Sequence, residues 1–348
     1  MKKVIVEQFG HPEVLKIKEF TTPEPAPGEV RVRLTSIGMN HADLMARKGE
    51  YRISTGLPPF TPGIEGGGVI DAVGKGVTSR HTGQRVILGA DIPQRKAIIK
   101  ESSSHDGTYS THYIVSAEKT VPAPDSIPDH QLGAIWLPYL TAWGCLVWKQ
   151  RIKPGQFVAI PAASSSVALA AAQIARHEKG IPIGMTTSQR KAEDLKKFAD
   201  NVYDAIIVTH DHHRKMSSWH RDLKKLTDRH GVDVFFDPVA AGEYLQMEVH
   251  SLAQSGTIWI YGLLGQTGPV DVTPLIRKHG SIRGWWLNEL TETGGSALKD
   301  GYHYILKGFE KGYFRQRVAK TFSLNQVVQA HMELQKGEHI GKLVLIPN

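Results

Sequence analysis

Three consecutive serines stand where a buried strand turns into an alanine-rich helix, in the stretch IPAASSSVALAAAQIA at residues 160–175. In α/β proteins this corner usually carries glycines and holds the pyrophosphate of a dinucleotide. Serine hydroxyls beside the first N–H groups of a helix suit the same task, because the helix dipole favours an anion there. The alternative is that Ser164 or Ser165 only caps the helix. The two roles are compatible, so the pattern predicts a dinucleotide site formed by Ala163, Ser164, Ser165, Ser166 and Val167.

The three glycine positions of the usual fingerprint fall on Ala162, Ser165 and Ala168. The first glycine serves the turn, the second lets the backbone approach the phosphates, and the third allows close packing of helix and strand. Alanine at position 162 predicts a turn that does not require a positive φ. Ser165 is the largest departure from the fingerprint, since its Cβ could crowd a pyrophosphate.

The end of the next strand indicates which dinucleotide the site would take. NAD-binding proteins place an acidic residue there, about 20 residues after the loop begins, to bind a ribose hydroxyl. This chain has hydroxyl and basic residues instead, and its first acid, Glu193, follows on the next helix. A 2′-phosphate would meet two hydroxyls and two cations, so we predict NADPH, bound by Thr187, Ser188, Arg190 and Lys191. The alternative is an ordinary charged helix start.

The elements that must position these residues follow two patterns along the chain. The first third alternates polar and apolar residues in the manner of short strands, as in EVRVRLTSIGM. From about residue 129 the chain alternates helices and strands, which is typical of a parallel, doubly wound sheet. The last segments, from HYILKGFEKGYF to GKLVLIP, are expected to return to the first domain.

Composition excludes several classes of protein. The chain has 348 residues, enough for two domains, and its 41% hydrophobic content is ordinary for a soluble globular protein. A single cysteine, Cys145, excludes an internal disulfide and any site with several thiolates. No apolar run approaches the length of about 20 residues that a membrane span needs, so we expect a cytoplasmic protein. The net charge of +8 is scattered over expected helix faces, which disfavours a nucleic-acid partner.

Seven landmarks make the whole chain resemble one family. In order they are FGHPEVLKI, PAPGEVRVRLTSIGMNHADL, PGIEGGGVIDAVGKGV, LTAWGCLV, KPGQFVAIPAASSSVALAAAQIA, DVFFDPV and IGKLVLIP. Together they resemble the medium-chain dehydrogenase/reductase superfamily, in its zinc-free quinone oxidoreductase and enone reductase branches. The resemblance implies a GroES-like catalytic domain at residues 1–124 and 289–348, and a Rossmann domain at residues 125–288. It also implies a homodimer, paired along a strand that includes Trp285 and Trp286.

The positions that hold catalytic zinc in related alcohol dehydrogenases are changed. The cysteine position resembles Asn40, the histidine position is Ile64, and Glu65 of the same motif is expected to be a structural carboxylate. Catalytic zinc needs about three nitrogen, sulfur or oxygen ligands, so we predict that the protein binds no metal. The cluster of His210, His212 and His213 is expected to be solvated, although such a cluster could bind a transition metal.

The resemblance also assigns residues to the chemistry. Asn40 matches a position that contacts nicotinamide or substrate, and Tyr51 matches a tyrosine that bonds the substrate carbonyl or delivers a proton in enoyl thioester reductases. Thr141, Gly262 and Lys342 match positions that bind the cofactor. The alternatives are a loop aromatic at Tyr51 and a mid-helix threonine at Thr141. Asp43 is expected to be structural.

These observations predict a zinc-independent, NADPH-dependent oxidoreductase that transfers hydride to a quinone or to an α,β-unsaturated carbonyl compound. A second hypothesis is a non-catalytic binding protein on a dehydrogenase scaffold, with nucleic acid as a candidate ligand. Its basis is that the loop lacks glycine and that the chain is basic. A zinc alcohol dehydrogenase is the third and weakest hypothesis.

Overall fold

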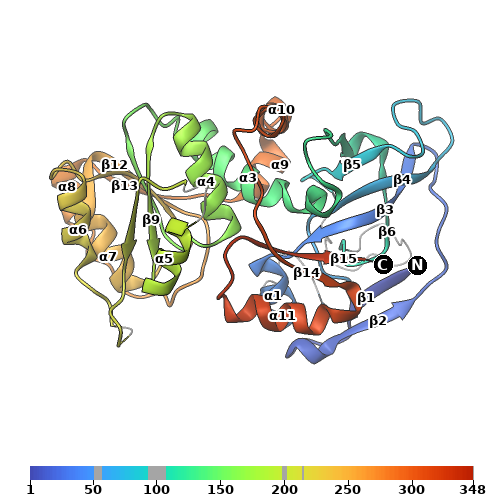
Figure 1. Ribbon diagram of the computed structural model, residues 1–348, viewed down its shortest axis with the longest axis horizontal. Coiled ribbons are helices and arrows are strands. Elements are labelled where there is room, and N and C mark those ends of the chain that lie inside the picture. Colours follow the sequence, from blue (N-terminus) through green and yellow to red (C-terminus); the bar gives the residue numbers. More distant parts are fainter. Residues whose placement is uncertain (51–56, 93–106, 198–201, 214, 348) are drawn as a thin grey trace. The chain divides into compact units, whose positions relative to one another are not determined.

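The computed structural model describes residues 1–50, 57–92, 107–197, 202–213 and 215–347 (Figure 1). The chain divides into two compact units. Unit 1 comprises Met1–Leu137 and Arg315–Asn348, and unit 2 is the continuous segment Pro138–Phe314. Within the described ranges, none of the helices combines the length and the apolar composition that crossing a membrane requires.

Unit 1 is built on a mostly antiparallel β framework, in which only β14 and β15 pair in parallel among the described strands. A seven-stranded sheet runs in the order β14-β15-β3-β4-β5-β7, with β6 paired to β3, and a second sheet pairs β1 with β2. Alternation explains the central strand, because Val30, Val32 and Leu34 are buried while Arg31 and Arg33 point to the other face. The strands are β1 (Lys2–Val6), β2 (Leu15–Glu19), β3 (Glu29–Gly38), β4 (Gly67–Val73), β5 (Arg85–Leu88), β6 (His112–Ser116), β7 (Thr120–Pro122), β14 (Val318–Ser323) and β15 (Lys342–Ile346).

Short helices complete unit 1. They are α1 (His41–Lys48), α11 (Val327–Lys336) and the 3₁₀ turns η1 (Pro12–Val14), η3 (Ala117–Lys119), η4 (Asp129–Ala134) and η6 (Leu324–Gln326). Helix α11 contacts both α1 and β15, so the C-terminal segment packs onto N-terminal elements. Contacts place Arg315–Asn348 in the same unit as Met1–Leu137.

Unit 2 contains a six-stranded parallel sheet in the order β10-β9-β8-β11-β12-β13. Numbered from the first strand of this sheet, the order is 3-2-1-4-5-6, the doubly wound order of dinucleotide-binding domains. The predicted fold class is thus confirmed. The strands are β8 (Phe157–Ile160), β9 (Ile181–Thr186), β10 (Ala205–Val208), β11 (Val232–Asp237), β12 (Leu252–Ile260) and β13 (Ser281–Gly284).

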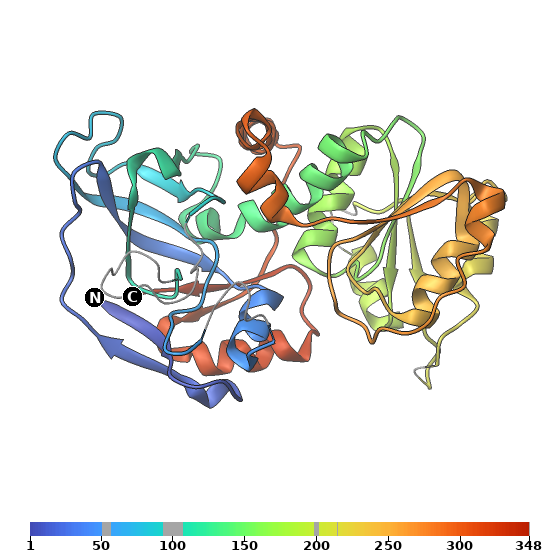
Figure 2. The same ribbon diagram turned by 180° about the vertical axis from the view of Figure 1, so that it is seen from behind.

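Helices cover both faces of this sheet. Figures 1 and 2 show α4 and α5 on one face and α6, α7 and α8 on the other, where α7 contacts both α6 and α8. The helices of unit 2 are α4 (Ser166–His177), α5 (Gln189–Lys197), α6 (Trp219–Leu226), α7 (Gly242–Ser251), α8 (Pro274–Lys278), α9 (Leu287–Thr293) and α10 (Ser296–Glu310). Helix α3 (Trp136–Trp143) crosses the division between the units and continues into a π-helical turn, η5 (Gly144–Lys149).

The unit boundaries differ from the predicted domain boundaries at residues 124 and 289. Unit 1 extends to Leu137 because η4 is bonded to it, through the N–H of Gly133 and the Oγ of Ser36 at 2.7 Å. Helices α9 and α10 belong to unit 2 because α10 packs against α3. The rings of Tyr139 and Phe309 lie 5.0 Å apart there, edge to face.

The expectation that Trp285 and Trp286 lie on a strand is wrong. Strand β13 ends at Gly284, and α9 begins at Leu287. The indole N–H of Trp285 donates to the backbone oxygen of Thr141 at 2.8 Å, and its ring is buried, while its backbone N–H still donates to the oxygen of Ile260 on β12. Trp286 is exposed at the start of α9.

Two buried groups between α1 and α11 are incompletely bonded. Arg47 is fully buried, and its Nη2 donates to Oε1 of Gln335 at 3.1 Å, while Nε and Nη1 have no partner among the described residues. His331 on α11 is also buried, and neither of its ring nitrogens has a partner in the described part of the chain. Its ring packs edge-on against Tyr109. Burial lowers the pKa of His331 to about 3, and the charge of Arg47 acts in the same direction.

Replacing this histidine tests the cost of its burial. His331→Phe keeps an aromatic ring against Tyr109 and removes two unbonded nitrogens, so the free energy of unfolding should rise by about 1 kcal/mol at pH 7. The unfolded histidine binds a proton below its ordinary pKa of about 6.5, whereas the folded one does so only near 3. Stability contributed by this residue is therefore lost as the pH falls from 6.5 towards 3, and the variant should lose less over that range.

Urea unfolding of both proteins at pH 7 and pH 5 measures the two effects. The exposed His303 provides the control, since His303→Phe should leave the pH dependence unchanged. If the unfolding free energies of wild type and His331→Phe changed equally between pH 7 and pH 5, the lowered pKa of His331 would be contradicted.

Candidate functional site

A buried ammonium group lies between a carboxylate and an amide in unit 1. Lys342 is 1% exposed, and its Nζ lies 2.5 Å from both Oε1 of Glu65 and Oδ1 of Asn40. The Nδ2 of Asn40 donates to the same Oε1 at 3.0 Å and to the backbone oxygen of Gly38 at 3.2 Å. Because each group satisfies the others, three polar side chains remain inside the unit, which unpaired charges could not do. We call Asn40, Glu65 and Lys342 the buried triad.

Strand pairing brings the triad together from three distant segments. Strand β15 pairs antiparallel with the end of β3, so that Lys342 at its start lies beside the turn that carries Asn40. Glu65 comes just before β4 and accepts from the backbone N–H of Leu137 through Oε2 at 3.1 Å. Gly38 is required for this approach, because a Cβ there would lie 2.4 Å from Oε1 of Glu65.

Asn40 also joins the triad to a second buried acid. Its backbone N–H donates to Oδ2 of Asp43 at 2.8 Å, and the hydroxyl of Tyr109 donates to the same oxygen at 3.2 Å. Burial raises the pKa of Asp43 to about 7, although the bond from Asn40 and the charge of Lys342 act against that shift. The structural role expected for Asp43 agrees with this position at the start of α1.

The structure brings two of the predicted site residues, Asn40 and Lys342, into direct contact. Both hydrogens of the Asn40 amide are engaged, one by Glu65 and one by the oxygen of Gly38, and Lys342 keeps one N–H for another partner. Their assignment to nicotinamide, substrate or cofactor therefore stays a prediction. Glu65, expected to be a structural carboxylate, accepts from both Lys342 and Asn40. Its only signal in the sequence was its place in the altered zinc motif.

The positions of the zinc ligands hold no metal-binding set in the described part of the chain. No three side chains of His, Cys, Asp or Glu come together there as ligands. The histidine cluster lies on a bend after β10, where the N–H of His213 donates to Oδ1 of Asp211 at 2.8 Å and the Oγ1 of Thr209 bonds Nδ1 of His210 at 2.9 Å.

The serine loop of unit 2 connects β8 to α4. Ser165 is the N-cap of α4, and its Oγ accepts from the N–H of Ala168 at 3.1 Å. The capping alternative is thus confirmed, and the hydroxyl hydrogen of Ser165 can still donate. At this helix start, the N–H groups of Ser166 and Val167 have no partner among the described residues. Ser164 is nearly buried beside them.

The turn at the start of this loop differs from the prediction. Ala162 has a φ of 52°, in the left-handed region, so the expectation of a turn without positive φ is wrong. The N–H of Ser165 donates to the oxygen of Ala162 at 2.8 Å, and this tight reversal requires the left-handed residue. Alanine tolerates that conformation at a cost of roughly 1–2 kcal/mol.

Neighbouring strands hold the loop in place. The N–H of Ala163 donates to the oxygen of Met185 at 3.0 Å, and the buried hydroxyl of Tyr203 donates to the oxygen of Ala163 at 2.8 Å. The loop follows β8, which lies between β9 and β11, where the strand order reverses. In open parallel sheets, ligands bind at the carboxyl ends of the strands at such a reversal.

Asp237 at the end of the neighbouring strand β11 is tied to its own loop. Its carboxylate accepts from the N–H groups of Val239 at 2.6 Å and Ala240 at 2.9 Å. Burial raises its pKa to about 6. Gly262 follows β12, and a Cβ there would lie 2.9 Å from the oxygen of Pro238, so the two strand ends approach closely.

The residues predicted to bind a 2′-phosphate follow β9. Thr187 and Arg190 are exposed, and the Oγ of Ser188 accepts from the N–H of Lys191 at 3.4 Å. The first acid, Glu193, is engaged with Gln189 through a bond of 3.1 Å on α5. Thr141 is nearly buried on α3. Tyr51 lies outside the described residues, so its role stays a prediction.

Two family models match the chain. Residues 26–125 match the alcohol dehydrogenase GroES-like domain, and residues 166–299 match the zinc-binding dehydrogenase family. Among curated relatives, the quinone oxidoreductase of Lama guanicoe is 30% identical, over 99% of this chain and 97% of its own. The 2-haloacrylate reductase of a Burkholderia species is 27% identical, over 99% of this chain and 98% of its own.

Solved structures agree with these relatives. An NAD-dependent alcohol dehydrogenase superposes with a TM-score of 0.86 at 28% identity, and all of both chains is covered. The Escherichia coli quinone oxidoreductase in complex with NADPH superposes with a TM-score of 0.83 at 25% identity, again over all of both chains.

Removing one charge from the buried triad should destabilise unit 1. Glu65→Gln leaves the Lys342 ammonium buried without its carboxylate, and Lys342→Met leaves the carboxylate without its cation. Each should lower the free energy of unfolding by about 3–5 kcal/mol. The double variant removes both charges and should recover most of that loss.

Urea unfolding of the four proteins completes a double-mutant cycle. Glu7→Gln, at the exposed pair of Glu7 and Lys18, is the control and should not change stability measurably. Losses that simply add in the double variant would show that the triad contributes no coupling.

Proposed function

Since the chain belongs to the medium-chain dehydrogenase/reductase superfamily, in its quinone oxidoreductase branch, we propose that it transfers hydride from NADPH to a quinone or an α,β-unsaturated carbonyl compound. The observation that carries the proposal is the serine loop, which places a helix start and three hydroxyls at the strand-order reversal of a doubly wound sheet. An oxidoreductase of this branch needs such a site for its nucleotide.

The residues of unit 2 fit an anionic dinucleotide. The N–H groups of Ser166 and Val167 would hold the pyrophosphate at the positive end of the α4 dipole, with the hydroxyls of Ser164 and Ser165 as further donors. Asp237 is the acid at the end of the neighbouring strand β11, and backbone N–H groups of its own loop engage its carboxylate. NADPH, when bound, supplies the hydride, and the chain supplies orientation and electrostatics.

The preference for NADPH rests on the end of β9. Hydroxyls at Thr187 and Ser188 and cations at Arg190 and Lys191 suit a 2′-phosphate, and no acid stands at the strand end. The solved neighbours include both an NAD-dependent enzyme and an NADPH complex, so the preference is argued from this chain's own residues.

Independence from zinc is proposed on the chemistry of the buried triad. Asn40 and Ile64 stand at the altered ligand positions, and neither supplies a thiolate or an imidazole. The carboxylate of Glu65, which belongs to the same motif, is already paired with the ammonium of Lys342. A dication beside this fixed cation would meet charge repulsion.

The two substrate classes differ in their need for an acid. Reduction of an enone places a proton on carbon, for which a positioned donor such as Tyr51 is useful, whereas the oxygens of a reduced quinone take protons from solvent. Quinone oxidoreductase and 2-haloacrylate reductase among the relatives support one class each. The cytoplasm stays our expectation for the compartment.

We further propose that the protein acts as a homodimer through β13. This strand is at the end of the six-stranded sheet, so one row of its backbone groups faces no strand among the described residues of unit 2. Exposed apolar side chains lie in the segments before it, with Ile276 76% exposed and Val272 52% exposed. Such residues favour burial against a second copy.

Nucleotide titration followed by fluorescence tests the cofactor. NADPH should bind at least about tenfold more tightly than NADH, because charge-assisted bonds to the 2′-phosphate are each worth about 1.5–3 kcal/mol. The double change Arg190→Ser and Lys191→Ser should remove most of that difference and leave NADH binding unchanged. Lys196→Ser, on the same helix, is the control.

Equal binding of the two nucleotides would contradict the assignment of Arg190 and Lys191. Binding of neither would overturn the enzyme proposal, and a non-catalytic protein on this scaffold would take its place. Salt-dependent binding of nucleic acid would then be the next measurement.

The Tyr51→Phe variant separates the two substrate classes. If Tyr51 delivers the proton, enone turnover should fall by about 10²-fold or more while quinone turnover is kept. Steady-state rates with one quinone and one enone, at saturating NADPH, give the comparison. Equal retention of both activities would remove Tyr51 from the catalytic residues.

A further inference from the structure

A cavity of about 490 Å³ opens in unit 1 between both ends of the described chain. Its lining includes Lys2, Glu19, Phe20, Arg33, His112 and Pro347. The volume falls within the range of small-molecule sites, about 300–1,000 Å³. None of these residues belongs to the buried triad or to the serine loop, so the cavity is not explained by the proposed function.

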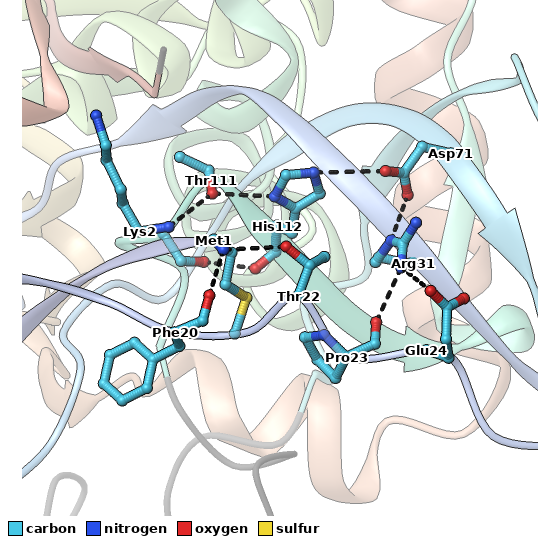
Figure 3. Close-up of polar contacts among 11 residues, drawn as sticks. Met1, Lys2, Phe20, Thr22, Pro23, Glu24, Arg31, Asp71, Thr111 and His112 are labelled. Carbon is cyan, nitrogen blue, oxygen red and sulfur yellow. Dashed lines mark hydrogen bonds and ion pairs between the residues drawn. The ribbon is translucent and has the colours of Figure 1, made fainter.

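One wall of the cavity is fixed by a chain of hydrogen bonds, which Figure 3 shows as a row. The backbone N–H of Lys2 donates to Oγ1 of Thr111 at 3.1 Å, and that hydroxyl bonds Nδ1 of His112 at 3.0 Å. The other ring nitrogen of His112 lies 3.4 Å from Oδ2 of Asp71. The wall therefore keeps its shape without a ligand.

The charges behind this wall compensate one another. The Nε of Arg31 donates to Oδ1 of Asp71 at 2.9 Å, and its Nη1 donates to Glu24 and to the oxygen of Pro23, both at 3.0 Å. Burial lowers the pKa of His112, and although Asp71 acts against that shift, Arg31 adds to it. His112 is therefore neutral at pH 7, and the wall presents a ring and a hydroxyl.

Arg33, on the same strand as Arg31, differs from Arg31 because its charge is not paired among the described residues. It lies two positions from Arg31, on the same face of β3, and opposite His112 in the register with β6. Its guanidinium has no hydrogen bond or ion pair with any described residue, and the same holds for the ammonium of Lys2. The lining thus combines three cationic groups with one carboxylate, Glu19: Arg33 and Lys2, and the α-ammonium of Met1, which donates to the oxygen of Phe20 and to Oγ1 of Thr22.

The rest of the lining is apolar. The Phe20 side chain is 44% exposed although it is apolar, and it lines the cavity. Pro347 lines the same cavity. The ammonium of Lys3 lies 5.7 Å from the Phe20 ring, which keeps positive charge near that ring as well. A ligand that meets both parts needs an anionic group and a flat apolar body.

We propose that this cavity binds a small aromatic carboxylate, with the carboxylate on Arg33 and Lys2 and the ring against Phe20 and Pro347. The planar fork of a guanidinium matches a carboxylate in two parallel bonds. Strand β15 separates this site from the buried triad, because it runs from Lys342 to Ile346 just before Pro347. At about 3.3 Å per residue, that is roughly 16 Å.

Saturation-transfer NMR with 1-naphthoate tests the proposal on the full chain. The wild type should bind this probe with a dissociation constant on the order of 1 mM, the affinity that a ligand of this size reaches in an open site. The neutral analogue 1-naphthamide should bind about tenfold more weakly. Arg33→Gln should weaken naphthoate binding by about tenfold and leave naphthamide binding unchanged.

Lys75→Gln is the matched control, since Lys75 is an exposed cation of unit 1 outside the cavity. It should bind naphthoate as the wild type does, and all three proteins should unfold at the same temperature. Binding that is the same for naphthoate and naphthamide, or that survives Arg33→Gln, would overturn the proposal. Because Arg33 has no part in the nucleotide site, the result is independent of NADPH binding.

Discussion

The buried contact of Lys342 with Glu65 and Asn40 is the constraint on which unit 1 depends. Moving one unpaired charge into a protein interior costs several kcal/mol, and the pair is tolerated only with good geometry and further hydrogen bonds. Here the amide of Asn40 and the N–H of Leu137 supply those bonds. The contact ties the end of β3, the segment just before β4 and the start of β15 together at one point, so leaving either charge without its partner destabilises all three.

The two units treat charge in opposite ways. Unit 1 pairs charges internally, through the triad and through Arg31 with Asp71, although the buried Arg47 bonds only a neutral amide among the described residues. Unit 2 leaves backbone N–H groups at the start of α4 without partners among the described residues. Its one acid at the neighbouring strand end is engaged by its own loop. Such an arrangement stabilises an incoming anion, which agrees with an oxidoreductase that uses a nicotinamide nucleotide.

Local patterns in the sequence predicted the parallel sheet and the cap at Ser165, because both depend on residues close together in the chain. The contact of Lys342 with Asn40 joins residues 302 positions apart, and no periodicity encodes it. The left-handed Ala162 was missed because alanine disfavours that conformation, and only the geometry of the turn requires it. The bond that holds the Trp285 indole likewise joins residues 144 positions apart, so no local pattern indicates it.

The division of the chain also has a consequence for its synthesis. Unit 2 is one continuous segment, whereas unit 1 combines Met1–Leu137 with Arg315–Asn348. Domains generally fold as units while the ribosome is still adding residues. The Rossmann-type sheet can therefore close during translation, while β3 waits for β15 and Glu65 remains without its lysine. The segment Met1–Leu137 is thus made first and completes its sheet last.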